Sequence, residues 1–87
     1  MRGIHHLEAF LEMLSAERGA AANTLAAYRR DIEDFGAFLA PRKRGLSEAG
    51  AEDVSAYLAS LAAQGLATAT QARRLSALRR FHRFLYG

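Results

Sequence analysis

The chain has 87 residues, of which 51% are hydrophobic and 24% are charged, and its formal net charge is +3. It contains no cysteine, which excludes both a disulfide scaffold and a zinc module built on cysteine ligands. Charged residues interrupt every apolar run well before the roughly 20 residues that a transmembrane helix needs. We therefore expect a single cytoplasmic domain over residues 1–87 that makes no contact with a membrane.

The composition favours an all-helical fold. The β-branched residues that strands prefer are limited to one Val, two Ile and three Thr, whereas the strong helix formers Ala, Leu and Arg are abundant. A chain of this size buries only about 60–65% of its unfolded surface, so the core is expected to be modest.

Apolar spacing predicts the first two helices. The first covers residues 4–18, and Gly19 follows it at the position of a left-handed cap. The second covers residues 22–40, where Pro41 is expected to end it by disfavouring helical geometry at Ala40. The seam of the second helix repeats at intervals of three and four residues: Leu25, Tyr28, Ile32, Phe35 and Leu39.

A basic, glycine-containing loop over residues 41–50 leads into two further helices. The third is predicted over residues 51–64, with Gly50 as N-cap and Gly65 closing it, and the fourth over residues 68–86. Four short helices with short connections predict a compact orthogonal four-helix bundle.

Charge is distributed unevenly along this bundle. Residues 1–53 carry a net charge of −2, whereas residues 54–87 contain five Arg and no acidic residue. Helices usually interleave both signs, so a helix of one sign suggests an anionic partner.

A helical wheel divides the fourth helix into an apolar face and a polar stripe. Small residues in the stripe let a helix approach a groove floor, and Arg side chains reach base edges or phosphates. A solvated Arg-rich face explains the pattern equally well, although the absence of acid favours contact with nucleic acid. The stripe holds Ala69, Arg73, Ser76, Ala77, Arg80 and Arg83, with Thr70 at its margin.

Arg74 differs from this stripe because it falls within the apolar face. An unpaired buried charge is strongly unfavourable, so Arg74 requires a partner. Asp31, beside the seam of the second helix, is the natural candidate. We expect an Arg74–Asp31 ion pair with a structural role, in preference to DNA contact by Arg74.

The second helix offers a related polar face. Asn23 and Thr24 lie in its first turn, where free backbone N–H groups suit phosphate binding. Spacing alone favours simple helix capping by these two residues. Arg30, which follows among alanines, is similar to the Arg residues of the fourth helix.

No catalytic or metal constellation is found in the sequence. His5 and His6 are adjacent, so on a helix they point about 100° apart and chelate one metal poorly. His82 is expected to pack half-buried, and Tyr28 and Tyr57 are expected in the core. We expect no cofactor, no metal, no small-molecule substrate and no enzymatic activity in this chain.

Three stretches together resemble the N-terminal core-binding domain of tyrosine recombinases of the Xer and phage-integrase type, a SAM-like fold. They are RGAAANTLAAYRRDIEDFGAFL at 18–39, AEDVSAYLASLAAQGLATAT at 51–70 and ARRLSALRRFHRFLYG at 72–87. The combination of NTL-AYRRD, DV--YL and T-ARRLSALR-F--FL in this order is specific, and it spans almost the whole chain.

The resemblance implies a helical domain that lies on one side of a DNA duplex while a separate catalytic domain lies on the other. Two helices of the small domain then cross near the major groove. The catalytic residues of the family belong to a C-terminal domain that this sequence lacks, so Tyr86 is not the nucleophile. Carried over by position, the residues facing DNA are Asn23, Thr24, Ala27 and Arg30 on one helix and Thr70, Arg73, Ser76, Ala77 and Arg80 on the other.

Two other hypotheses remain at this point. The Arg-rich face could bind an acidic protein partner, and other recombinase protomers on DNA would be partners of the same kind. A regulator that occupies recombination sites without cutting would have the same sequence features. The interpretation as a double-stranded DNA interface requires that Arg73 and Arg80 not be bound by carboxylates.

Overall fold

A computed structural model describes residues 2–87, which fold into four α-helices and two short 3₁₀ turns. The α-helices are α1 (Ile4–Arg18), α2 (Ala22–Leu39), α3 (Ala51–Ala63) and α4 (Thr68–Tyr86). The 3₁₀ turns η1 (Ala40–Arg42) and η2 (Leu46–Glu48) connect α2 to α3. The described residues contain no strand, and none of their helices has the length and apolarity needed to cross a membrane.

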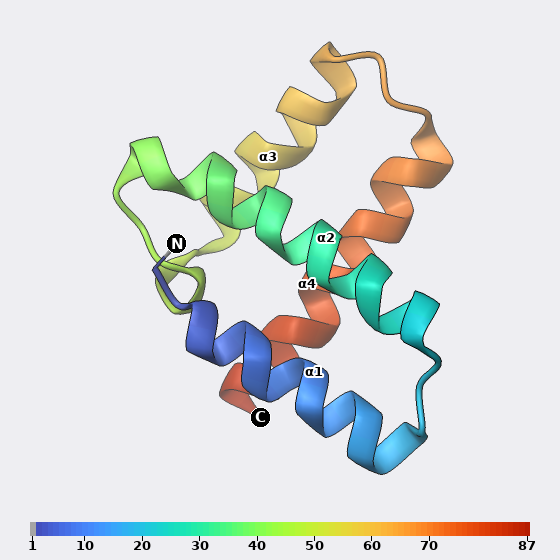
Figure 1. The fold of residues 1–87 in the computed structure, drawn as a ribbon. Helices are drawn as coiled ribbons and strands as arrows, with labels where there is room; N and C mark the ends of the chain where they lie inside the picture. The colour runs from blue at the N-terminus through green and yellow to red at the C-terminus, as the bar shows by residue number, and fades with distance from the viewer. Residues whose placement is uncertain (1) are drawn as a thin grey trace.

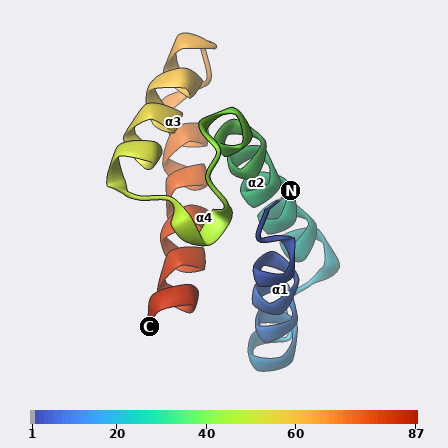
Figure 2. The same ribbon diagram turned by 90° about the vertical axis from the view of Figure 1, so that its left-hand side faces the viewer.

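The helices form two antiparallel hairpins, α1–α2 and α3–α4. Figure 1 shows that the second pair crosses the first, with α4 passing behind α2. The perpendicular view in Figure 2 places α3 and α4 on one side of the molecule and α1 and α2 on the other. The predicted all-α fold, a four-helix bundle, is therefore confirmed.

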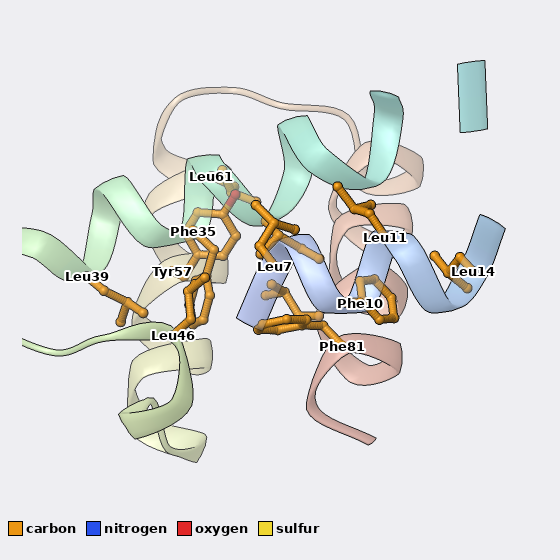
Figure 3. Packing of buried hydrophobic residues seen from close by; sticks show 12 residues of the cluster. Leu7, Phe10, Leu11, Leu14, Phe35, Leu39, Leu46, Tyr57, Leu61 and Phe81 are labelled. Carbon is orange, nitrogen blue, oxygen red and sulfur yellow. The ribbon is translucent and has the colours of Figure 1, made fainter. Parts of the chain in front are cut away.

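The core lies where the four helices and η2 meet (Figure 3). Every α-helix contributes apolar side chains at helical spacing, which is the pattern expected of amphipathic helices around one core. Phe10 joins the two hairpins, because its ring packs 5.4 Å from the Phe81 ring and 5.7 Å from the Tyr28 ring. The buried cluster consists of Leu7, Phe10, Leu11, Leu14, Ile32, Phe35, Leu39, Leu46, Tyr57, Leu61, Leu78 and Phe81.

The helix ends follow the local chemistry of the sequence. Gly19 takes the left-handed conformation (φ 56°) and its N–H bonds the Ser15 carbonyl, as predicted. At the start of α3, the N–H of Gly50 donates to Asp53 Oδ2 at 3.0 Å. This bond is the main reason that the pKa of Asp53 is lowered, with a further contribution from Arg42.

The end of α2 differs from the prediction. The α-helix stops at Leu39, but Ala40 keeps helical geometry (φ −55°, ψ −49°) and Pro41 lies within η1. The expectation that Pro41 moves Ala40 out of the helical region is wrong. The chain tightens into a 3₁₀ turn instead, which accommodates a proline near its start.

The segment between α2 and α3 is more ordered than a basic loop. Leu46 on η2 is fully buried in the core cluster, and Figure 3 shows it reaching in from this segment. The basic residues of the segment are partly neutralised, because Asp53 lies 2.8 Å from Arg42 Nε and 3.5 Å from Arg44 Nε. The segment is thus anchored by one apolar side chain and one buried carboxylate.

Replacing Leu46 by Ala tests this anchor. We expect a loss of about 2–5 kcal/mol in the free energy of unfolding, the usual range for a buried Leu. Chemical denaturation followed by circular dichroism measures it. The control is Ile4→Ala, at an exposed apolar residue, for which we expect a change within about 0.5 kcal/mol. Equal losses in both variants would contradict the role of Leu46.

His82 is expected to make the stability of the fold depend on pH. It is half-buried between Phe35, Phe81 and Tyr86, and its Nε2 has no hydrogen-bond partner among the described residues. Burial disfavours the imidazolium and lowers the pKa of His82 from 6.5. The unfolded chain therefore binds the proton more readily than the folded one does.

We expect the free energy of unfolding to fall as the pH drops from about 7 to 5, across and below the ordinary His pKa. Because the folded pKa is depressed, the contribution of neutral His82 is complete above this window and is lost on acidification. In His82→Gln the decline should be shallower. Urea unfolding at each pH measures both proteins, and parallel declines would contradict the assignment.

Candidate nucleic-acid interface

The N-termini of α2 and α4 have no side-chain cap. The N-cap residues are Ala21 and Ala67, both in extended conformation, and neither helix receives a side-chain capping bond. Capping by Asn23, which spacing alone favours, does not occur, and Asn23 and Thr24 are exposed. Because neither helix end receives a side-chain cap, N–H groups of both first turns remain available to a ligand.

A groove with a volume of about 380 Å³ runs between α2 and α4. It lies toward the N-terminal halves of both helices, which Figure 1 shows on the same side of the molecule, in cyan and orange. The lining is small and polar, with one aromatic ring. It consists of Asn23, Thr24, Ala27, Tyr28, Asp31, Arg73, Ser76 and Ala77.

Most of the residues predicted to face DNA meet in this groove. Asn23, Thr24 and Ala27 line it from α2, and Arg73, Ser76 and Ala77 line it from α4. Ala77 was predicted on an outward stripe but is only 4% exposed, because the side of α4 that carries it packs toward α2. It therefore forms part of the groove wall and not of an open surface.

Arg30, Thr70 and Arg80 are not among the lining residues. Arg30 is exposed and lies three residues after Ala27, on the same face of α2. The guanidinium of Arg80 lies over the ring of Tyr28, 5.8 Å from its centroid. Arg80 also lines a second groove, of about 400 Å³, together with residues of α1 and the C-terminal part of α4.

Tyr28 and Asp31 are the two lining residues that sequence reasoning assigned elsewhere, to the core and to a structural ion pair. Their spacing in the sequence nevertheless places these two residues on the face of α2 that lines the groove. Thr24, Ala27, Tyr28 and Asp31 fall at i, i+3, i+4 and i+7, the spacing of a single helix face. Arg73, Ser76, Ala77 and Arg80 repeat this spacing on α4. On each helix the residues that line the groove therefore belong to a single face.

Asp31 is buried, with 3% of its surface exposed, and its Oδ2 accepts a hydrogen bond from Arg73 Nη1. Arg74 Nε lies 4.0 Å from Asp31 Oδ1, at the limit of an ion pair. The Asp31–Arg74 contact is thus present but long, and Arg73 supplies the close one. The requirement that Arg73 and Arg80 not be bound by carboxylates therefore fails for Arg73, whereas Arg80 makes no ion pair with a described carboxylate.

Arg74 has a closer partner of its own. Its Nη1 lies 2.6 Å from Asp34 Oδ2 and donates to the Tyr57 hydroxyl at 3.1 Å. The same hydroxyl donates to Asp34 Oδ2 at 2.5 Å, so α2, α3 and α4 share one polar network. Burial, together with the Asp34 carboxylate, raises the pKa of Tyr57 to about 12 and keeps the phenol protonated.

The other Arg residues of α4 differ from this pair. Within residues 2–87, no ion pair is found for Arg79, Arg80 or Arg83, nor for Arg30 on α2. The neighbouring Arg29 is bound by Glu8 through two hydrogen bonds, of 2.6 and 2.9 Å. The cationic surface near the groove therefore rests on Arg30 and Arg80, whereas Arg73 is neutralised.

Comparison with known proteins identifies the family. The sequence profile of the phage integrase N-terminal SAM-like domain matches residues 7–87, which include all four helices in whole or in large part. The chain belongs to this family. The predicted resemblance and the SAM-like fold are confirmed together.

Relatives with high identity are tyrosine recombinases named XerD. This integrase N-terminal domain is 60% identical to the Rhizobium meliloti protein over 93% of its own length and 26% of the relative. Identity to the Agrobacterium fabrum protein is 61% over 92% of the chain and 24% of the relative. Identity to the Brucella abortus protein is 55% over 99% of the chain and 28% of the relative. The chain spans about a quarter of these relatives. No solved structure matches it.

Asp31→Ala tests the ion pairs between α2 and α4. Removing a buried carboxylate leaves Arg73 and Arg74 without it, and we expect a loss of about 1–3 kcal/mol in the free energy of unfolding. Thermal and urea unfolding measure it. The control Glu8→Ala removes an exposed ion pair and should produce a smaller loss. A loss below about 0.5 kcal/mol for Asp31→Ala would contradict a structural role.

Proposed function

We propose that this domain is the DNA-binding core-binding domain of a site-specific tyrosine recombinase. It lays the α2–α4 groove and its borders against the major groove and phosphates of a duplex. Strand cleavage belongs to a separate catalytic domain of the whole protein, acting on DNA in the cytoplasm. Other protomers on the same DNA are further partners, and no small-molecule substrate is involved.

The observation that supports this proposal most directly is the groove itself. Two helices from different hairpins bring their small and polar faces together, and six of the nine positions expected to face DNA line the space between them. Side chains as small as Ala27, Ser76 and Ala77 permit close approach of a sugar-phosphate strand or a base edge. The names of the relatives, which describe recombinases, agree with a DNA partner.

The distribution of charge supports phosphate binding at the borders of the groove, which are formed by Arg30, Arg80 and the first turns of α2 and α4. Arg30 and Arg80 make no ion pair with a described carboxylate, and each continues a groove-facing stripe toward the C-terminal end of its helix. The uncapped first turns of α2 and α4 add backbone N–H groups and the positive ends of two helix dipoles. Such features position a duplex through its phosphates, whereas base contacts carry sequence information.

The salt dependence of duplex binding tests the proposal. If about five phosphates are neutralised, the logarithm of the affinity should fall against the logarithm of the salt concentration with a slope of about −4 to −5. Fluorescence anisotropy with a labelled duplex measures it for residues 1–87. Arg30→Ala should reduce the magnitude of the slope by about 1, because one phosphate contact is lost.

Arg29→Ala provides the matched control, since it removes the same charge from the neighbouring position, where Glu8 already neutralises it. We expect its slope to remain that of the unaltered chain. An affinity that does not change with salt would contradict DNA binding. Retention on poly-glutamate that excess duplex fails to displace would favour the alternative, an acidic protein partner for the Arg-rich face.

A further inference from the structure

The ion pair between Asp31 and Arg73 lies inside the groove between α2 and α4. Both residues line the groove, and Asp31 Oδ2 accepts from Arg73 Nη1. The two side chains differ in exposure, because the Asp31 side chain is 4% exposed whereas the Arg73 side chain is 50% exposed. The carboxylate is thus buried at the base of the groove, whereas half of the Arg73 side-chain surface is exposed.

This arrangement makes Arg73 a poor phosphate clamp. A phosphate at Arg73 would approach the buried Asp31 carboxylate, and like charges at short range repel one another. Nor is Arg73 easily released, since Asp31 would then retain only the 4.0 Å contact with Arg74. An uncompensated buried carboxylate is strongly unfavourable. Arg30, which makes no ion pair with a described carboxylate, is better suited to phosphates.

The same arrangement suits recognition of a neutral base edge. A guanidinium has five N–H donors in a planar fork, and Asp31 engages the fork through Nη1. The remaining donors make no hydrogen bond with a described residue, and the small side chains of Ser76 and Ala77, which line the same groove, leave room for a ligand. Guanine presents two acceptors, O6 and N7, that match such a fork in the major groove.

We propose that Asp31 is a positioning residue that holds Arg73 to read a base edge, with guanine as the preferred base. Arg30 instead neutralises a phosphate. This inference rests on the proposed function, because it assigns different tasks to cations of the same DNA-binding surface. It predicts that the loss of Arg73 affects sequence discrimination, whereas the loss of Arg30 affects salt dependence.

The experiment uses residues 1–87 and two probes. The first is a duplex enriched by the unaltered chain from a library with a randomised 20-bp segment, and the second is the unselected library. Anisotropy titrations at several salt concentrations give the affinity ratio of the two probes and the salt slope. Arg73→Ala should lower the ratio about tenfold, and the ratio is the deciding readout because the unpaired Asp31 carboxylate left behind also changes the slope. Arg30→Ala should leave the ratio unchanged and reduce the slope by about 1.

Two further variants separate the effect of the guanidinium geometry of Arg73 from the effect of its charge. Arg73→Lys keeps the charge but lacks the fork, so its ratio should fall as far as that of Arg73→Ala. Asp31→Asn releases Arg73, which should steepen the slope by about 1 and lower the ratio. Circular dichroism establishes that each variant is folded at the temperature of the titration. Arg79→Ala, at an exposed position of α4 outside both grooves, is the control and should retain the ratio.

Several results would overturn the inference alone. One is an Arg73→Ala variant that loses salt dependence as Arg30→Ala does while its ratio is unchanged. Another is an unaltered chain that binds duplex with the expected slope but enriches no sequence. A third, which remains informative if Asp31→Asn does not fold, is an Arg73→Lys variant with the full ratio. If the unaltered chain binds no duplex, the proposed function fails as well.

Discussion

The buried carboxylate of Asp31 is the constraint on which the arrangement of α2 and α4 depends. A carboxylate with 3% exposure requires partners, and the partners available are two consecutive Arg residues of α4. An alternative register of the two helices would separate these charges. Because the groove is lined by residues that precede Asp31 on α2 and by residues that follow Arg73 on α4, the ion pair also fixes which side chains face one another across it.

The polar network therefore links stability to the shape of the surface. Asp34 binds Arg74 and the Tyr57 hydroxyl, which joins α3 to the α2–α4 contact. Below this network, Phe35 packs against Tyr57 with ring centroids 5.1 Å apart. The groove thus rests on a rigid base of packed rings and charge-assisted hydrogen bonds. Side chains held in this way retain their geometry when a ligand approaches, so less ordering is required on binding.

Local sequence patterns were sufficient to predict the helices but not the chain between them. Apolar periodicity and the residues Gly19 and Gly50 act within a few positions, so α1 and the start of α3 were predicted at their observed bounds. The segment after Leu39 depends on long-range contacts. Leu46 is isolated among polar residues, and only packing against the assembled helices explains its burial. The helical conformation of Ala40 before Pro41 likewise follows from the turn into that segment.

The electrostatics of the site could be predicted only in part, for a related reason. A helical wheel uses the residues of one helix, so it placed Arg73 and Arg80 on one stripe and found no acid there. The compensating charges are on α2, 42 residues away in sequence for Asp31 and Arg73. The ion pairs distinguish these two Arg residues, because Arg73 is bound to Asp31 whereas Arg80 lies over the Tyr28 ring and makes no ion pair with a described carboxylate. The sequence of one helix therefore determines which residues share a face, but the charge of that face depends on the helix packed against it.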